Sequence, residues 1–283
     1  MKILYVGSCH FKNNNAINMY DLDIDHVSDL THDLDLSRYN CVFCPSIMID
    51  KEYIIKNPNI KFIFGPHLSV FPDERFLNMH HPNVIYITPS EWVKTCFKSS
   101  PYTHGLDIRV LPFGVDTDRF KPDNLNRYDH VFIYFKHRYY QELDLIINEL
   151  NKRNIKIIWI FNYDNKYRED YYYDVIKSCK WGVWVGAHES QGFALQEALS
   201  CNVPLLVWNV SSMNQEAGFN NPDVPATSIP YWSDECGEYF YHIGDFDRVY
   251  RKFINNLNDY RPREYILENL SVDVCKKKFL NLV

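Results

Sequence analysis

The stretch HESQGFALQEALSCNVPLLVWN, residues 188–209, decides how this chain folds. It links two apolar runs, WGVWVG at 181–186 and VPLLVW at 203–208, through a segment with helical spacing at 192–201. Short apolar runs separated by a helix are typical of a parallel sheet covered by helices. The loop 188–191 then leaves the carboxyl end of a strand and enters a helix near Gly192. Ligands of doubly wound folds bind at this edge of the sheet.

The same alternation runs through the whole chain. The apolar runs predict strands at 2–7, 41–45, 61–66, 84–89, 108–113, 130–135, 155–161, 181–186 and 203–208. Helical patterns lie at 89–97, 140–152, 168–179, 192–201 and 245–258. Two such successions predict an α/β protein with two Rossmann-like domains.

A segment rich in Pro, Asp and Asn separates the two successions. It reads FGVDTDRFKPDN at 113–124 and suits a connection between domains. We therefore expect a first domain at 1–113, a second at 114–262, and a tail at 263–283 that forms one or two helices. Region 12–39 has few strand-like runs, so the first domain is expected to be a shortened version of its type.

Composition excludes several classes of protein. With 283 residues, 46% hydrophobic and 23% charged, the chain is globular, and its net charge of −6 argues against nucleic-acid binding. No apolar stretch is long enough for a transmembrane segment, and the opening MKILYVG is expected to be a first strand and no signal peptide. The eight cysteines are scattered, and the one close pair, Cys41 and Cys44, is expected to be two buried, reduced thiols. The protein is expected to be cytoplasmic.

Two glutamates, Glu189 and Glu197, flank the start of the helix near residue 192. The amides of Gly192 and Phe193, at the positive end of the helix dipole, favour an anion such as phosphate. Carboxylates accept hydrogen bonds from paired hydroxyls. The pattern thus fits an elongated ligand with hydroxyls at both ends and phosphates between them, as in a nucleotide sugar. From the spacing alone, both glutamates could equally be surface residues.

These residues resemble a known family. Glu189 and Glu197 match the E-x7-E motif of the retaining glycosyltransferases of family 4, and ALSCNVPLLV is similar to the segment that follows that motif. ITPSEWVKTCF and RVLPFGVDTDRFKP are similar to the two segments that lead into the family's interdomain linker. The resemblance covers about residues 84–260. It implies the GT-B architecture, with a C-terminal helix that crosses back to pack on the N-terminal domain.

The resemblance also implies roles in the second domain. Glu197 is expected to bind the nucleotide ribose, Glu189 to approach the donor sugar, and the amides of Gly192 and Phe193 to help hold the sugar and the diphosphate. A basic pair after the first strand of the second domain binds the diphosphate in this family. Arg138 fits the arginine, while His137 stands at the usual glycine and Gln141 at the usual lysine. Lys136 is the candidate for the second cation.

In the first domain, the family's glycine-rich loop corresponds to VGSCHFKNNN, where Gly7 and Ser8 are present without a second glycine. His67, after a predicted strand, matches a histidine that faces the donor sugar and is a candidate catalytic residue with Glu189 and Arg138. A lone histidine is also common as a structural residue, so this alternative stays open.

The sequence gives little support for a metal or a cofactor. Asp-x-Asp pairs begin at Asp21, Asp23, Asp33, Asp116 and Asp245, but none follows a clear strand end, and no phosphate-binding or dinucleotide-binding glycine motif is present. We expect no metal and no cofactor besides the nucleotide-sugar substrate.

The predicted function is a metal-independent, retaining glycosyltransferase that moves a sugar from a nucleotide-diphosphate donor to a hydroxyl acceptor. Two alternatives remain: a nucleotide-sugar 2-epimerase, which needs no acceptor, and a non-catalytic module that binds sugar nucleotides or glycans.

Overall fold

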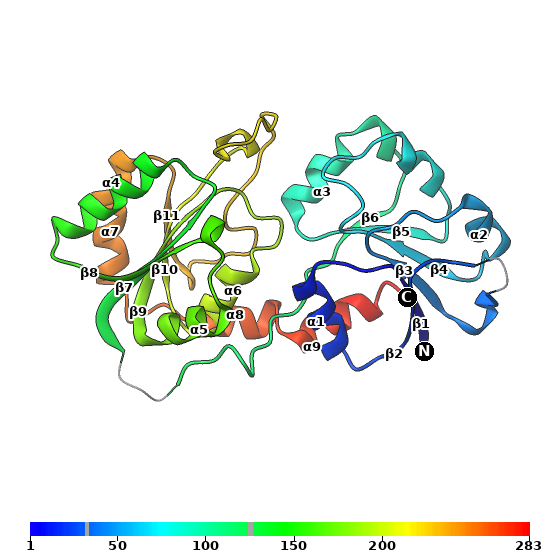
Figure 1. Ribbon diagram of the computed structural model, residues 1–283, viewed down its shortest axis with the longest axis horizontal. Helices are drawn as coiled ribbons and strands as arrows, with labels where there is room; N and C mark the ends of the chain where they lie inside the picture. Colours follow the sequence, from blue (N-terminus) through cyan, green and yellow to red (C-terminus); the bar gives the residue numbers. More distant parts are fainter. Residues whose placement is uncertain (32–33, 124–126) are drawn as a thin grey trace. The chain divides into compact units, whose positions relative to one another are not determined.

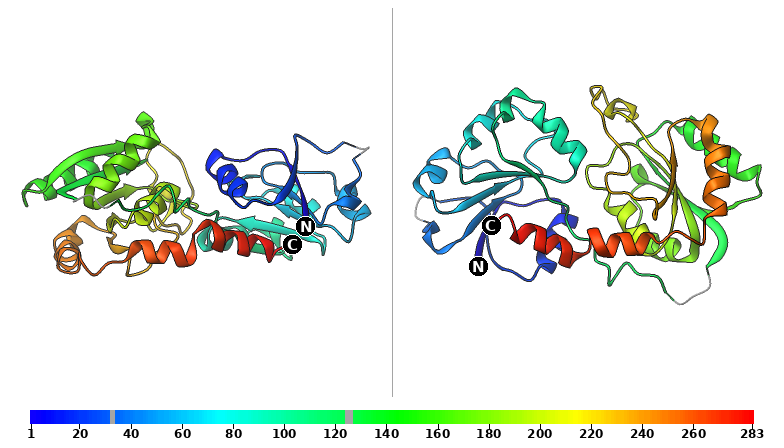
Figure 2. Two further views of the ribbon diagram at one scale, coloured as in Figure 1. Left: turned by 90° about the horizontal axis from the view of Figure 1, so that it is seen from below. Right: turned by 180° about the vertical axis from the view of Figure 1, so that it is seen from behind.

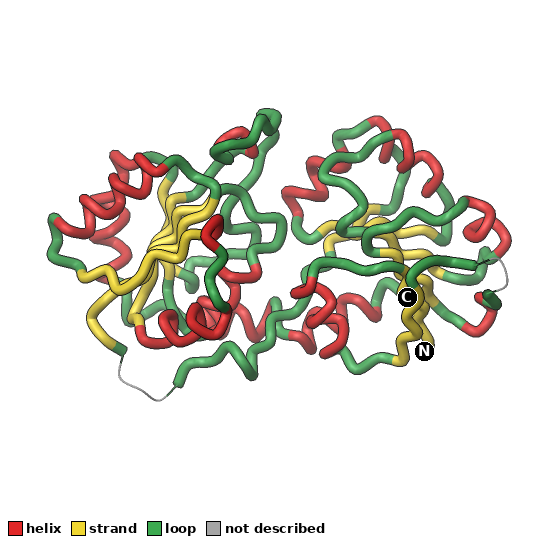
Figure 3. Tube along the Cα trace, viewed as in Figure 1, coloured by secondary structure: helices red, strands yellow, loops and turns green. Residues whose placement is uncertain are grey.

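The computed structural model describes residues 1–31, 34–123 and 127–283. It divides into two compact units, one formed by residues 1–114 with 272–283 and the other by residues 115–271. Each unit contains one parallel sheet with helices on its faces (Figures 1 and 3). The prediction of two Rossmann-like α/β domains is therefore confirmed.

Within the described residues, the sheet of the first unit has six parallel strands in the order β2-β1-β3-β4-β5-β6. The strands are β1 Lys2–Val6, β2 Asp23–Val27, β3 Cys41–Cys44, β4 Lys61–Phe64, β5 Val84–Thr88 and β6 Ile108–Val110. The helices are α1 Phe11–Met19, α2 Lys51–Lys56, α3 Glu91–Lys98 and α9 Val272–Leu280, with 3-10 turns η1 Leu36–Arg38, η2 Glu74–Met79 and η3 Pro101–Thr103. The strand order reverses between β1 and β3.

Both faces of this first sheet are buried, as expected of a parallel sheet. Alternate strand residues such as Leu4 pack with Ile54 of α2 and Phe97 of α3 in one core. On the other face, Phe43 of β3 contacts Phe279 of α9, with ring centroids 5.7 Å apart. Cys41 and Cys44 are both buried on β3, in agreement with the predicted buried thiols.

Within the described residues, the second unit has five parallel strands in the order β11-β10-β9-β7-β8. The strands are β7 Tyr128–Lys136, β8 Lys156–Asn162, β9 Cys179–Gly186, β10 Leu205–Trp208 and β11 Gly237–Phe240. The helices are α4 Tyr140–Asn151, α5 Glu169–Ser178, α6 Phe193–Ser200, α7 Phe246–Asn255 and α8 Pro262–Asn269, with 3-10 turns η4 Tyr163–Asn165, η5 Met213–Gln215 and η6 Ile243–Asp245. Here the strand order reverses between β7 and β9.

Helices cover both faces of the second sheet (Figures 1 and 2). Helices α4 and α7 lie on one face, where Ile146 and Phe253 pack against Ile133 of β7. Helices α5, α6 and α8 lie on the other face, where Leu199 and Ile266 share a core with Phe132. Because the five described strands are parallel, their carboxyl ends all lie at one edge of the sheet.

The C-terminal tail is shared between the units. The expected boundary lies at 262/263, whereas the structure changes unit at 271/272. Helix α8 stays with the second unit because Ile266 and Leu270 lie in its core. Helix α9 belongs to the first unit, where Gly114 lies so close that a Cβ on it would be 2.5 Å from the Cα of Val272. Only glycine permits this approach.

Candidate active site

The site lies where the strand order of the second sheet reverses. Lys136 ends β7, and Glu189 lies in the loop that follows β9, so the two residues flank the switch point. Ligands of open α/β sheets bind at such a point. Lys136 Nζ donates to Glu189 Oε1 over 2.9 Å, and both side chains are largely buried, 17% and 11% exposed. The structure thus brings together two residues that the sequence analysis assigned separately.

The surroundings of Lys136 favour its charge. Burial disfavours the ammonium, but the carboxylate of Glu189 outweighs that effect and raises the pKa of Lys136. The ammonium also lies 4.6 Å from the ring centroid of Tyr163 in η4, a cation–π contact. Lys136 is therefore a fixed cation at the carboxyl edge of the sheet.

Helix α6 starts beside this pair. Its N-cap is Gly192, with φ +79° and ψ 50°, a left-handed conformation that glycine adopts without strain. The first amides of an α-helix have no partner within the helix, so the α6 N-terminus offers donors to an anion. The loop before it is held by the amide of Glu189, which donates to the carbonyl of Thr227 over 2.9 Å. Phe193 is the first residue of α6 and is half-buried.

Glu197 lies within α6 and is 5% exposed. Its charge acts on Tyr167, which precedes α5. Burial is the main reason why the pKa of the Tyr167 phenol is raised, and the carboxylates of Glu197 and Glu189 raise it further. Tyr167 Oη also lies 3.4 Å from Tyr134 Oη. Tyr167 is thus a shared neighbour of both glutamates.

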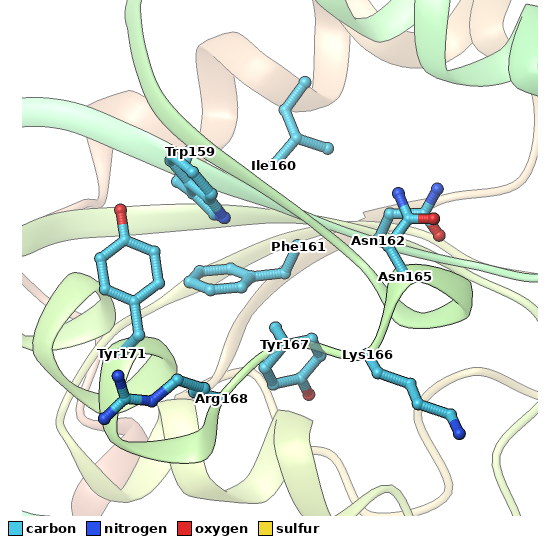
Figure 4. Close-up of a pocket in the computed structure, with 9 residues that line it drawn as sticks. All are labelled: Trp159, Ile160, Phe161, Asn162, Asn165, Lys166, Tyr167, Arg168 and Tyr171. Carbon is cyan, nitrogen blue, oxygen red and sulfur yellow. The ribbon is translucent and has the colours of Figure 1, made fainter.

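A pocket of about 360 Å³ opens next to Tyr167. Figure 4 shows its aromatic wall, in which Trp159 and Phe161 come from β8 and Tyr171 from α5. The Trp159 and Tyr171 rings meet edge-on with centroids 5.0 Å apart, and Phe161 meets Tyr167 at 5.1 Å. The polar part of the lining is Asn162, Asn165, Lys166 and Arg168. The sequence analysis missed this pocket, because its residues come from a strand, the loop that follows it and the next helix, and no spacing rule marks them as a set.

Arg138 is buried, and its guanidinium is engaged in hydrogen bonds within the protein. Its side chain is 2% exposed, and Nε donates to Glu142 Oε2 over 2.9 Å while Nη2 pairs with Glu142 Oε1. Nη1 donates to the carbonyls of Gly186 and Trp208 over 3.2 and 3.3 Å. The guanidinium ties the ends of two strands to α4, so it is a scaffold group in this structure. Lys136 is the cation that faces Glu189.

A second polar cluster, which the sequence analysis missed, surrounds His137. Its Nδ1 lies 2.7 Å from Glu216 Oε1 and its Nε2 lies 3.0 Å from Asp164 Oδ1. His188 Nε2 lies 3.8 Å from the other oxygen of Glu216. Because Glu216 is far from His137 in sequence, no spacing rule could have paired them.

In the first unit, the expected residues gather at the carboxyl edge of its own sheet. Gly7 and Ser8 follow β1, and the carbonyl of Ser8 accepts a hydrogen bond from Ser46 after β3. The amide of His10 donates to Nδ1 of His67 over 3.3 Å. Desolvation and the nearby charge of His10 lower the pKa of His67. His67 and the Gly7–Ser8 loop thus share one edge, and the role of His67 stays a prediction.

Among the described residues, no group of three or more His, Cys, Asp or Glu side chains is arranged to hold a metal ion. The pair that begins at Asp33 lies outside the described residues, and the pair that begins at Asp245 stands at the start of α7. None of the helices in the described part of the chain combines the length and apolar character needed to cross a bilayer.

Comparison with known proteins identifies the fold. No protein-family model and no curated protein matches the chain. Among solved structures, a glycosyltransferase from Rickettsia africae ESF-5 aligns with a TM-score of 0.61 and 12% identity over 99% of this chain and 97% of its own. Sucrose-phosphate synthase from Thermosynechococcus elongatus gives 0.57 and 10% identity over 100% and 98%.

A third neighbour is a variant of S. aureus TarM in complex with ligands that include UDP, with a TM-score of 0.55 and 14% identity. The alignment covers 86% of this chain but 55% of TarM, so this chain spans little more than half the length of TarM. At such identities the likeness concerns the fold, and that fold is GT-B: two Rossmann-like domains.

Proposed function

We propose that the protein is a glycosyltransferase that moves a sugar from a nucleotide-diphosphate sugar to a hydroxyl acceptor. The observation that carries this proposal is the Lys136–Glu189 pair at the switch point of the second sheet, beside the N-terminus of α6. A cation, helix amides and two carboxylates in one region suit a ligand with an anionic centre and hydroxyls on either side. The GT-B fold supports the same class.

In this proposal, Glu197 accepts hydrogen bonds from the ribose, and Glu189 approaches the donor sugar. Lys136 and the amides of Gly192 and Phe193 hold the diphosphate. The pocket beside Tyr167 receives the base, because it offers flat apolar rings and polar groups at its rim. Tyr167 connects the pocket to the two carboxylates, because its ring lines the pocket and the charges of Glu189 and Glu197 act on its hydroxyl.

The reaction breaks the bond between the sugar and the diphosphate, so negative charge develops on the leaving group. The ammonium of Lys136 is already fixed by Glu189 and needs little reorganisation to stabilise that charge. We further propose, from the E-x7-E resemblance, that the acceptor attacks from the face of the departing group with retention, and that no divalent metal takes part.

One observation favours a second candidate, a module that binds sugar nucleotides without turnover. Arg138, the expected arginine of the diphosphate-binding pair, is engaged in contacts with Glu142 and two strand carbonyls. A site with one cation stabilises a leaving diphosphate less than a site with two. The epimerase alternative uses the same donor site and differs in needing no acceptor.

A thermal-shift panel of UDP-, GDP- and ADP-sugars without added metal tests the donor site. The variants are Lys136→Met and, as the matched control, Lys180→Met, which removes an exposed lysine paired with Asp129. One nucleotide class at 100 times its dissociation constant should stabilise wild type and control by about 2.7 kcal/mol, and Lys136→Met should lose this response. The proposal is wrong if no sugar nucleotide stabilises the wild type, or if Lys136→Met responds as the control does.

Product analysis with the bound donor then separates the candidates. Sugar transfer that requires an acceptor identifies a transferase, and an epimerised product without acceptor identifies an epimerase. Binding without any product across a panel of acceptors identifies the module.

A further inference from the structure

We propose that His137 is a positioning residue: its ring clamps two loops against the end of β7, next to Lys136, by bonding a carboxylate on each loop. The inference rests on the proposed function in that it concerns the same site. The family resemblance places glycine at this position, so the clamp is a property of this chain's own sequence.

The two ring nitrogens of His137 face two carboxylates. Nδ1 lies 2.7 Å from Glu216 Oε1 and Nε2 lies 3.0 Å from Asp164 Oδ1, both within hydrogen-bond distance. A neutral imidazole has one N–H and can donate to one of them, whereas the imidazolium donates to both. The geometry as a whole is therefore that of the charged ring.

The partners of His137 come from two different loops. Asp164 lies in η4 after β8, and Glu216 lies in the long connection between β10 and β11. The backbone takes part as well, since the carbonyl of His137 accepts from the amide of Ala217 over 2.8 Å. The rings of Tyr163 and Phe219 lie on the imidazole with centroids 5.3 and 5.2 Å away. Removing the ring thus removes a contact to each loop.

The backbone conformation of His137 is unusual. Its φ is +48°, in the left-handed region, which is uncommon for residues other than glycine, although Asn, Asp and His adopt it more often than the rest. Such strain persists where surrounding contacts over-determine it, and it is common at functional sites. Two charge-assisted hydrogen bonds offset the strain here.

The clamp connects to the candidate site through Tyr163. This residue neighbours Asp164 in η4, and the ammonium of Lys136 lies over its ring. Without the contact between His137 and Asp164, the η4 turn that supports Lys136 is held less firmly. The orientation of Lys136 toward Glu189 and a bound diphosphate then becomes less defined.

Two variants separate the clamp from a folding role. His137→Gly removes the ring and suits the left-handed backbone, so the fold is retained. His137→Asn also tolerates this backbone and keeps one donor group. His242→Asn, at an exposed histidine of the same unit, is the matched control.

The first measurement needs no ligand. Hydrogen exchange of amides in 163–168 and 209–236 should be at least about tenfold faster in His137→Gly than in wild type and in the control. It should be intermediate in His137→Asn. Wild-type protection of these amides in His137→Gly overturns the clamp.

The second measurement is the affinity for UDP-, GDP- and ADP-sugars. The class that binds wild type should bind His137→Gly about tenfold more weakly, with His137→Asn in between and His242→Asn equal to wild type. If no sugar nucleotide binds while exchange depends on His137, the proposed function fails and the clamp stands. If one binds His137→Gly as it binds wild type, the positioning role is wrong although the function stands.

Discussion

At the scale of single residues, Glu197 and Arg138 are the two buried members of the Asp, Glu, Lys and Arg group among the described residues. A carboxylate that is 5% exposed loses most of its hydration, and an apolar residue in its place would avoid that loss. Buried ionisable groups are common at functional sites, where the charge is used. The neighbouring Tyr167, which lines the pocket, puts this charge next to a cavity large enough for a planar group.

Glu197→Gln should keep the fold and weaken donor binding. The substitution preserves shape and removes the charge, so a ribose diol loses hydrogen bonds to a carboxylate. Hydrogen bonds to charged groups contribute about 1.5–3 kcal/mol, so the affinity should fall roughly tenfold to hundredfold. Titration calorimetry with the nucleotide sugar that stabilises wild type measures this. Glu268→Gln, at an exposed position of α8, should bind as wild type does, and equal affinity in both variants would exclude a role of Glu197 in donor binding.

The site shows which residue assignments a sequence supports. Lys136 and Glu189 could be placed because each follows a strongly apolar strand whose carboxyl end is visible in the sequence. The burial of Arg138 could not be foreseen, since it depends on the carbonyls of Gly186 and Trp208 at the ends of two other strands. Contacts of this kind are set by strand order, which one sequence does not reveal.

At the scale of elements, the predicted strands at buried positions are found, whereas two edge strands were missed. Strand β2, DIDHV, has no fully buried residue and carries alternate acids, so its apolar signal is weak. Strand β11, GEYF, is short and starts at a glycine. Helix α1 was missed because FKNNNAINM has three asparagines in its first half and little apolar periodicity. Region 12–39 therefore holds more regular structure than its sequence indicates.

Polar contacts stabilise β2 where apolar packing is weak. Asp25 of β2 accepts a hydrogen bond from Tyr39 Oη over 2.7 Å and pairs with Arg38 and Lys2 over 2.9 and 3.0 Å. The hydrogen bond from Tyr39, followed by those from the two cations, holds the pKa of Asp25 well below its usual range. The sheet edge is thus fixed by charge-assisted bonds, which depend on pH.

Asp25→Asn should lower stability at neutral pH, and the difference from wild type should shrink in acid. A carboxyl whose pKa is lower in the folded than in the unfolded chain stabilises the fold above its unfolded value, about 3.9, and loses this contribution as the pH falls below it. Chemical unfolding of both proteins between pH 7 and 3 measures the effect. Asp50→Asn, which the structure places before α2 without a side-chain cap, is the control. A gap that stays constant down to pH 3 would contradict the role given to Asp25.

At the scale of the whole molecule, the C-terminal residues are divided between the two units. The sequence predicted a C-terminal segment that returns to the first domain from residue 263, and the structure assigns 272–283 to that unit. The break could not be read from the sequence because only Leu270 and Ser271 separate α8 from α9. What separates them is the partner of each helix: α8 packs in the core with α6, and α9 packs on β3 and Tyr20.

Phe279→Ala should therefore destabilise residues 1–114 and 272–283 in preference to 115–271. Phe279 is 2% exposed and contacts both Tyr20 and Phe43, so its loss leaves a cavity that costs about 3–5 kcal/mol. Hydrogen exchange resolved by segment should show the increase in the first unit. The mirror variant, Phe253→Ala in the core of α7, should raise exchange within 115–271 instead. The two substitutions remove the same side chain from a buried position, so their exchange patterns can be compared directly. If both variants raise exchange in the same segments, the two units unfold together, and α9 stabilises the whole chain and not the first unit alone.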